Sequence, residues 1–278
     1  MKDISTNRVN ANRWHFCLAI TAIFLVIPFS QAFAQANDFT KYGISLGIFV
    51  TDRDSKTRFD AQANPASGTI VDLETELGLD SSDSVFRLDG YFRFNQKHRL
   101  DFSWFDLSRT ASTPIQRDID WNDTMFAINT VIDSDFDLSI YKAAYTWSFL
   151  RRDKGYLGLT AGLYVADIQT TLSAPSIAAS EVGSVTAPLP VFGLRGEYYF
   201  SDKWTFRASG EIFVFEYEDF DGSLYDIYAG LDYQLFDRMA VGFGINSVRM
   251  DIGVTKVNAT GNIDWRYDGG LLFIKFDF

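Results

Sequence analysis

The chain alternates apolar and polar residues with a period of two over much of its length after residue 36. The clearest example is its last segment, residues 263–278. Phe276 and Phe278 fall on one side of an extended chain there, whereas Lys275 and Asp277 fall on the other. A period of two is that of a β-strand. Charges confined to one side, opposite a continuously apolar side, are typical of a strand that separates lipid from an enclosed lumen.

The same alternation predicts ten strands, at residues 41–51, 84–94, 98–109, 135–149, 156–170, 188–200, 204–217, 223–236, 239–254 and 263–278. Short turns follow the second, fourth, sixth and eighth strands. Longer connections follow the others, among them the polar stretches 52–83 and 110–134 and the small-residue loop 171–187. This layout predicts an all-β fold, a transmembrane antiparallel up-and-down β-barrel. Twelve strands result if 58–63 and 70–74 pair inside the membrane, and eight if one weak hairpin stays outside.

The N-terminal 36 residues have the pattern of a secretory signal peptide. Basic residues precede the apolar run 16–29, and the small-residue sites Ala32-Phe33-Ala34 and Ala34-Gln35-Ala36 follow it. We expect cleavage to leave residues 37–278 as a single barrel domain. Cys17 lies within the apolar run, so the mature chain would contain no cysteine and no disulfide.

Composition and charge agree with a barrel and exclude one class of partner. The sequence is 47% hydrophobic and 16% aromatic, as expected for strands with aromatic girdles. Removing residues 1–36 changes the formal net charge from −11 to −13, because Lys2, Arg8, Arg13 and Asp3 leave with them. Nucleic acid is therefore not an expected partner. No later stretch reaches the roughly 18 apolar residues of a spanning helix.

Two resemblances to known proteins add to this interpretation. The final strand resembles the closing strand of bacterial outer-membrane barrels, which typically ends in Phe with aromatic residues alternating before it. Residues 68–80 (GTIVDLETELGLD) and 86–109 (FRLDGYFRFNQKHRLDFSWFDLSR) are similar to a group of small proteobacterial outer-membrane barrel proteins of undefined role. The resemblance implies an integral protein of the bacterial outer membrane, surrounded by lipid and lipopolysaccharide. It also implies that the assembly machinery recognises Phe276 and Phe278.

The charges on the inward faces are balanced. The predicted register turns seven basic and seven acidic residues into the lumen: Arg87, Arg93, Arg99, Lys142, Arg195, Arg207 and Lys275, with Asp89, Asp101, Glu197, Glu211, Asp226, Asp232 and Asp277. Such a balance suits mutual neutralisation, whereas a selective pore more often carries a ring dominated by one sign. A slip of one residue in any strand would exchange its two faces.

Residues that could carry catalysis are scarce. The segment 43–47 matches the G-x-S-x-G pattern of serine hydrolases, but it lies within a predicted strand rather than at a sharp strand-to-helix turn. Of two histidines, His15 belongs to the signal peptide and His98 follows a short turn. Outer-membrane barrel enzymes generally rely on a histidine. We therefore expect no catalytic site and no cofactor.

Two acidic clusters are candidate metal sites: Asp118, Asp120 and Asp123, and Glu218, Asp219 and Asp221. Neither has both the D-x-D-x-D-G pattern and the glutamate at the twelfth position of a calcium loop. Solvated turns are favoured, with weak divalent-cation binding near lipopolysaccharide as the alternative.

The sequence thus favours a non-enzymatic outer-membrane barrel with acidic outer loops and a structural or surface-interaction role. A barrel of ten strands has a narrow interior, and the charges above would plug it together with inward aromatic residues: Tyr91, Tyr164, Tyr199, Tyr228 and Phe273. One alternative is a small channel or transporter for a polar solute. A second is a barrel enzyme acting on lipid or peptide. The sequence identifies no extracellular partner.

Overall fold

The computed structural model describes residues 40–60, 68–122, 124–217, 220–256 and 259–278, so the predicted signal peptide lies outside the described residues. The chain divides into Met1–Ala36 and Asn37–Phe278, and the barrel belongs to the second unit. Its elements are β1 (Tyr42–Phe59), β2 (Val71–Asp72), β3 (Ser82–Arg93), β4 (His98–Pro114), β5 (Ile119–Trp121), β6 (Thr124–Phe126), β7 (Val131–Arg152), β8 (Gly155–Ala174), a 3₁₀ turn (Pro175–Ile177), β9 (Ala179–Tyr199), β10 (Trp204–Tyr217), β11 (Phe220–Phe236), β12 (Met239–Lys256) and β13 (Ala259–Asp277).

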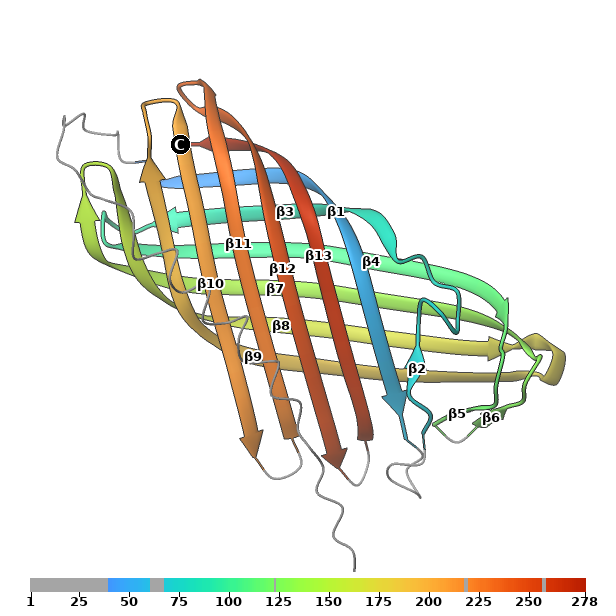
Figure 1. The fold of residues 1–278 in the computed structure, drawn as a ribbon. Helices are drawn as coiled ribbons and strands as arrows, with labels where there is room; N and C mark the ends of the chain where they lie inside the picture. The colour runs from blue at the N-terminus through green and yellow to red at the C-terminus, as the bar shows by residue number, and fades with distance from the viewer. Residues whose placement is uncertain (1–39, 61–67, 123, 218–219, 257–258) are drawn as a thin grey trace, which may run out of the picture. The chain divides into compact units, whose positions relative to one another are not determined.

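Within the described residues, no helix is both long and apolar enough to cross a membrane. The strands instead form a closed ring (Figure 1). Each main strand pairs antiparallel with its neighbour in the chain, and β13 pairs back onto β1 from Gly43↔Asp277 to Phe59↔Gly261. The prediction of a ten-stranded antiparallel barrel is confirmed. β2 adds only two pairs to the edge of β1, and β5 and β6 form a separate hairpin, so neither enlarges the ring.

Both ends of the barrel domain meet at one rim. The backbone N–H of Phe278 donates to the carbonyl oxygen of Tyr42 at 2.8 Å, and the N–H of Lys41 donates to that of Phe278 at 2.8 Å. The tight turns at 94–97, 153–154, 200–203 and 237–238 lie at this rim, because an even number of ring strands, counting β1, precedes each turn. We call this rim the short-turn end and the opposite rim the loop end.

The strands extend further toward the loop end than the sequence predicts. β7 has 22 residues and β9 has 21. The expected loop at 171–187 is wrong, because β8 continues to Ala174 and β9 begins at Ala179. Residues in this stretch still alternate: Leu172 and Ala174 are fully buried, whereas Ser184 is exposed. The polar residues that indicated a loop lie on the outer face of a paired hairpin.

The chemistry of the two faces reverses partway along the strands. Near the short-turn end of β7, Trp147 is exposed and Thr146 is buried. Nearer the loop end of the same strand, Asp137 is exposed and Phe136 is buried. The barrel is therefore apolar outside and polar inside in one section, and polar outside and apolar inside in the next.

The reversal occurs at matching register positions within two groups of neighbouring strands, β4, β7, β8 and β9, and β1, β13 and β12. Strand register places the last outward apolar or aromatic residues side by side, namely Trp104↔Tyr141, Tyr141↔Val165, Val165↔Pro188, Val50↔Gly270 and Gly270↔Ile245. Two residues further on, the outward neighbours are polar, namely Asp106↔Ser139, Ser139↔Asp167, Asp167↔Thr186, Asp52↔Asp268 and Asp268↔Ser247. A common level is expected where lipid gives way to water.

Aromatic pairs mark the other boundary, at the short-turn end. Their ring centroids lie 4.7–6.3 Å apart in Tyr42–Phe278, Phe92–Phe94, Trp147–Phe149, Tyr198–Phe200 and Trp204–Tyr233. Such girdles sit at membrane interfaces. Along β1, the outward residues from Tyr42 to Val50 span the apolar band, which matches the roughly 9–11 residues of a tilted transmembrane strand.

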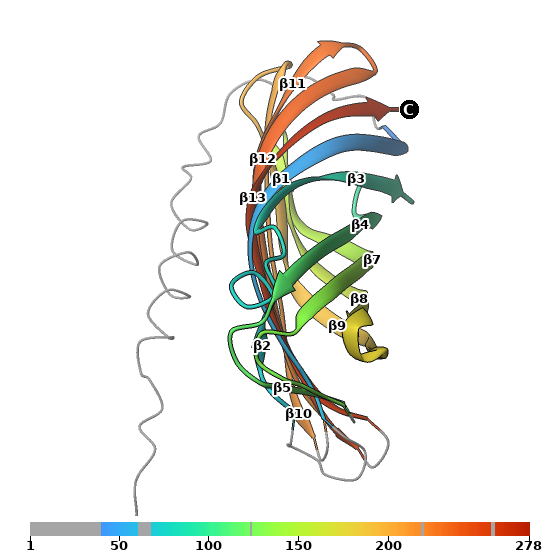
Figure 2. The ribbon, with the colours of Figure 1, turned by 90° about the vertical axis from the view of Figure 1, so that its right-hand side faces the viewer.

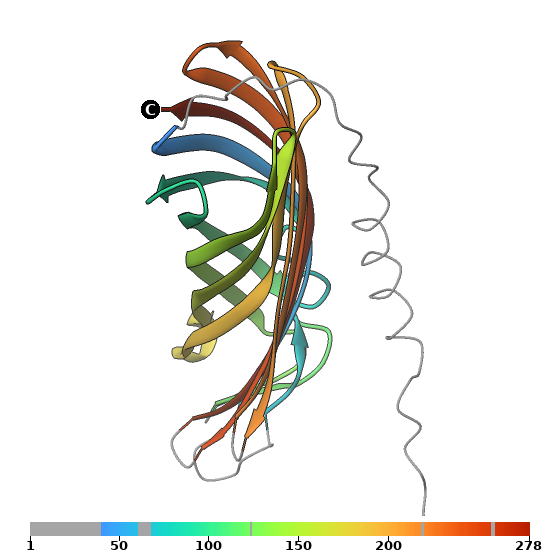
Figure 3. The ribbon, with the colours of Figure 1, turned by 90° about the vertical axis from the view of Figure 1, so that its left-hand side faces the viewer.

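Two of the ladders in the ring stop early. The β9–β10 ladder ends at Phe192↔Ile212 and the β3–β4 ladder ends at Arg87↔Phe105, although β9, β10 and β4 all continue toward the loop end. The loop-end section therefore divides into two walls, one made of β4, β7, β8 and β9 and the other of β10–β13 and β1. Figures 2 and 3 show the first wall curving away from the second.

Pro188 and Pro190 explain where the β9–β10 ladder ends. Both lie in β9 and pair in register with Val165 and Leu163 of β8. Proline has no N–H, so within a continuous ladder its missing donor must point away from the paired strand. That direction is toward β10. β9 thus lacks two successive donors on its β10 side, and the ladder stops at Phe192, two residues from Pro190.

Between the two walls, the loop-end section has a hydrophobic core. Residues 71–79 and the β5–β6 hairpin supply Leu73, Leu77 and Trp121, which are at most 1% exposed. The Trp121 ring lies 5.1 Å from that of Phe59 at the end of β1. They pack with inward strand residues, among them the fully buried Trp265, Phe49, Ile132, Phe136, Leu138 and Ile168.

A small buried charge cluster lies beside this core. The Glu74 carboxylate accepts a hydrogen bond from Arg109 Nη1 at 2.5 Å and from the backbone N–H of Ser55 at 2.9 Å. Arg53 is also buried, and its Nη2 reaches only the backbone carbonyl of Asp83, at 3.4 Å. Burial, followed by the positive charge of Arg109, lowers the pKa of Arg53 to about 10. Glu74 is therefore the counter-charge of the buried Arg109 guanidinium group.

The position of the lipid band can be tested on one face of β8. Leu159 is 49% exposed below the reversal, and Gln169 is exposed above it on the same face. An arginine at the lipid midplane costs roughly 2–4 kcal/mol, whereas a surface substitution in water usually stays within about 0.5 kcal/mol. Urea titration in lipid vesicles should show a large loss of unfolding free energy for Leu159→Arg and almost none for Gln169→Arg. Equal losses would contradict this placement of the membrane.

The Glu74 cluster can be tested with a matched pair. Glu74→Gln leaves Arg109 buried without its counter-charge, which should lower the unfolding free energy by about 3 kcal/mol. Glu76→Gln is the control, because its partner Arg117 lies at 2.7 Å but is 50% exposed, and exposed pairs contribute about 0–1 kcal/mol. Chemical unfolding in the same vesicles measures both. A loss for Glu76→Gln as large as that for Glu74→Gln would refute the argument.

Candidate functional site

The candidate site is the barrel lumen within the apolar band. All fourteen charged residues that the sequence places on inward faces form at least one ion pair there. They come from seven strands: β3, β4, β7, β9, β10, β11 and β13. We name three groups after one carboxylate in each: the Glu197 cluster, the Asp226 cluster and the Asp232 cluster.

The Glu197 cluster contains three arginines and two carboxylates. Glu197 binds Arg93 at 3.1 Å and Arg99 at 2.7 Å. Arg99 also binds Asp101 at 2.7 Å, and Arg195 approaches the same carboxylate at 3.5 Å. Because β3, β4 and β9 supply these side chains, the cluster links strands across the lumen. One arginine, Arg99, bridges both carboxylates.

The Asp226 cluster lies where polar lumen meets apolar core. Lys142 Nζ pairs with Asp226 at 3.2 Å and with Glu211. Asp226 also accepts hydrogen bonds from Asn246 Nδ2 at 2.6 Å and from the Tyr164 hydroxyl. On the other side of the cluster, Arg87 donates to the side-chain oxygen of Asn246 at 2.8 Å and pairs with Asp89 at 3.0 Å, completing the group. Neutral side chains thus connect its ion pairs.

The Asp232 cluster lies nearest the β1–β13 closure. Asp232 pairs with Arg207 at 2.9 Å and with Lys275 at 3.4 Å. Lys275 also pairs with Asp277 at 3.0 Å, and the Tyr91 hydroxyl donates to Asp277 at 2.7 Å. Buried charges require such partners, because an isolated one is costly to remove from water.

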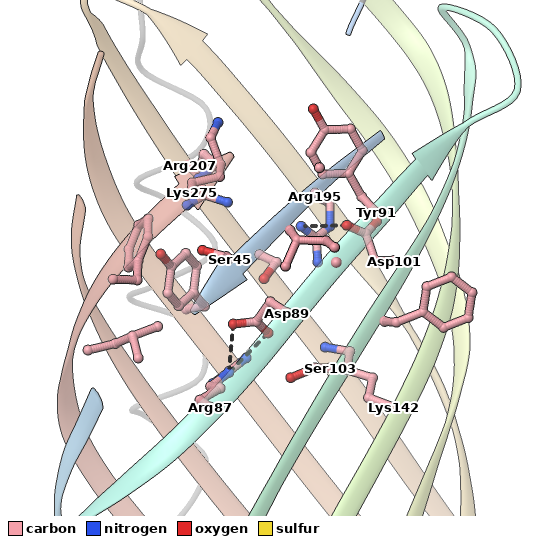
Figure 4. Close-up of a pocket in the computed structure, with 18 of the residues that line it drawn as sticks. Ser45, Arg87, Asp89, Tyr91, Asp101, Ser103, Lys142, Arg195, Arg207 and Lys275 are labelled. Atoms are coloured by element: carbon pink, nitrogen blue, oxygen red, sulfur yellow. Dashed lines mark hydrogen bonds and ion pairs between the residues drawn. The ribbon is translucent and has the colours of Figure 1, made fainter. Parts of the chain in front are cut away.

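Space remains between the clusters. A pocket of about 70 Å³ lies among residues of all three. Figure 4 shows Arg87 bonded to Asp89 and Arg195 bonded to Asp101 beside it, with Arg207 and Lys275 next to each other. The three serines Ser45, Ser103 and Ser209 and the two tyrosines Tyr91 and Tyr228 also line it. These groups can bind a polar solute by charge and hydrogen bonding.

The hydrophobic core that fills the loop end of the lumen was not predicted from the sequence. Its signal was present, because outward residues change from apolar to acidic while inward residues change from polar to apolar. In β13, for example, Asp264 and Asp268 face outward, whereas Trp265 and Tyr267 are buried. Contacts such as Glu74 with Arg109 carry no such signal, because 35 residues separate them in the chain.

The residues considered for catalysis are not brought together. Ser45 lies within β1, where residues 43–47 are extended, so the G-x-S-x-G match forms no nucleophile elbow. His98, the only histidine among the described residues, contacts the Tyr145 hydroxyl at the short-turn end. No group of three metal-ligating side chains occurs among the described residues. Asp123, Glu218 and Asp219 from the acidic clusters lie outside them.

The two residues of the expected assembly signal lie in the closing strand. Phe276 pairs with Ile44 of β1 and faces outward. Phe278 is 47% exposed, and its ring stacks on Tyr42 at 5.4 Å. Both are therefore accessible from the lipid side of the barrel.

Comparison with protein-family models and with curated proteins finds no match. Solved structures do match. The outer membrane protease OmpT from Escherichia coli has a TM-score of 0.56 at 10% identity, covering 89% of this chain and 99% of that one. The Ail attachment protein of Yersinia pestis (TM-score 0.34, 12% identity, 84% and 99% covered) and the toluene transporter TodX of Pseudomonas putida (0.35, 8%, 86% and 90%) are more distant.

These identities are too low to assign an activity, and the similarity to OmpT shows the fold alone. The chain has the closed antiparallel β-barrel fold that outer-membrane proteins adopt.

Proposed function

We propose that this protein is an integral, non-enzymatic barrel of the bacterial outer membrane that does not conduct. Its role would lie in its outer surface or in the organisation of the membrane. The observation that carries the proposal is closure of the lumen at two successive levels. The apolar band encloses the three ion-pair clusters, and the section beyond it is filled by hydrophobic residues.

The two closures oppose ion flow by different means. In the band, long side chains from facing strands occupy the narrow cross-section of a ten-stranded barrel. In the loop-end section, a dehydrated core that includes Leu73 and Trp121 fills the interior beside the Glu74 cluster. An ion passing through would lose its water without gaining replacement ligands there.

A surface role is supported by the outer face of the loop-end section. The wall of β4, β7 and β8 presents five outward carboxylates above the apolar band: Asp106, Asp133, Asp135, Asp137 and Asp167. Such a face would repel anionic partners and attract cationic ones. Lipopolysaccharide is the expected surrounding of this level, since lipid contact ends just below it.

The absence of enzymatic activity is proposed on chemical grounds. Ser45 has no histidine among the pocket residues, and His98 lies at the opposite rim from the loop-end core. A serine or aspartyl mechanism needs a positioned base. A solute channel is the second candidate, because the pocket between the clusters is an interior space with polar walls.

Planar-bilayer recording distinguishes the two candidates. The unmodified protein should show no stable conductance, and Arg195→Ala with Arg207→Ala should lower stability because Asp101 and Asp232 each lose a partner. Lys56→Ala is the control, because its ion pair with Asp54, at 3.9 Å, lies on the exposed outer face. Steady, long-lived channels in the unmodified protein would favour the transporter instead.

The proposed outer-membrane location depends on assembly of the closing strand. Deleting Phe278, or replacing it with Lys, removes its ring contact with Tyr42 and the aromatic terminus that the assembly machinery is expected to recognise. The amount of folded barrel in outer-membrane fractions, measured by the mobility shift of unheated samples, should fall. Phe236→Lys is the control, because Phe236 is an exposed aromatic residue at a short turn. Unchanged assembly of the Phe278 variants would overturn the recognition step.

A further inference from the structure

The pocket between the ion-pair clusters is more basic than the lumen as a whole. It is lined by six basic side chains and three acidic ones: Arg87, Arg99, Lys142, Arg195, Arg207 and Lys275 with Asp89, Asp101 and Asp226. The remaining carboxylates, which include Glu197, Glu211 and Asp232, pair with these basic groups but do not line the pocket. Basic side chains therefore outnumber acidic ones by three on the pocket walls, and carboxylates behind the walls pair with them.

Arg195 has unused hydrogen-bonding capacity at this place. Its ion pair with Asp101, at 3.5 Å, is longer than that of Arg99 with the same carboxylate, at 2.7 Å. Its Nε is buried and has no hydrogen-bond partner among the described residues. An unpaired buried donor of a charged group is costly. A bound acceptor in the pocket would supply the missing partner.

We propose that this pocket binds a small oxyanion that carries two or more negative charges, such as phosphate. Four of its six basic groups are guanidinium groups, whose planar forks match oxyanions. Hydroxyl groups of Ser45, Ser103 and Ser209 add neutral donors. A multivalent oxyanion accepts more charge-assisted hydrogen bonds from these groups than a monovalent one does.

The location determines where the anion comes from. The pocket is inside the barrel wall, so a lipid head group in the surrounding membrane does not reach it. The hydrophobic core at the loop end closes that side. The ligand is therefore a free solute that enters from the short-turn end and leaves the same way. Binding does not require the barrel to conduct, so this inference is independent of the proposed function.

Ser209→Asp provides a direct test. Ser209 pairs in register with Arg195 and lines the pocket, so an aspartate there places a fixed carboxylate where the anion would bind without removing any ion pair. The folded full-length barrel domain in detergent micelles is titrated with inorganic phosphate, against sodium chloride at equal ionic strength. Phosphate should raise the thermal unfolding midpoint of the unmodified protein more than chloride does.

Ser209→Asp should unfold at a higher temperature without phosphate, and its apparent phosphate affinity should fall by about tenfold or more. Ser139→Asp is the matched control, because Ser139 lies on the outer face between Asp106 and Asp167 in register, away from the pocket. It should keep the phosphate effect. If Ser209→Asp does not fold, Ser103→Asp, also at the pocket lining, replaces it.

Two results would overturn the proposal. One is a phosphate effect in the unmodified protein no larger than that of chloride. The other is an equal phosphate effect in Ser139→Asp and the pocket variant, which would place the bound anion on the outer surface. Absence of conductance in the same preparation would leave the binding result unaffected, so the two proposals fail separately.

Discussion

Every backbone N–H and C=O that faces lipid must find a partner within the protein, because hydrocarbon offers none. A closed ring of strands meets this requirement, since every strand then has a neighbour on both sides. The β1–β13 ladder closes the ring over its whole height, from Gly43↔Asp277 to Phe59↔Gly261. Closure also fixes the side-chain arrangement, since alternate residues must then face lipid or lumen.

The lumen follows from that alternation. A narrow ring forces inward charges together, and they remain charged only where opposite signs meet, as Glu197 does with Arg93 and Arg99. Beyond the lipid, water takes over the outer face and the hydrophobic effect acts inward. Trp121 and Phe136 are buried there, and Ile48 and Leu159 are exposed on the outer face of the band, because apolar side chains avoid water in both sections. The same strands are thus apolar outside and polar inside within the band, and polar outside and apolar inside beyond it.

Much of this was predictable from the sequence. The period of two near Phe278 indicated the closing strand, and the inward charges followed once the faces were assigned, because each strand carries its own alternation. Strand ends beyond the membrane were not predicted, since outward acidic residues such as Asp52 and Asp54 resemble loop residues when apolar-out is assumed. The Glu74–Arg109 contact and the pocket depend on the three-dimensional meeting of distant segments, which no local pattern encodes.

The two short ladders give the ring an uneven stiffness. The wall of β4, β7, β8 and β9 and the wall of β10–β13 and β1 are each cross-linked along their length, whereas β9 and β10 share rungs only from Tyr199↔Thr205 to Phe192↔Ile212. The barrel wall is therefore more easily deformed along the β3–β4 and β9–β10 boundaries than within either wall. At the β9–β10 boundary, Pro188 and Pro190 determine how far the two walls are joined, because each lacks the N–H that would have donated a hydrogen bond to β10.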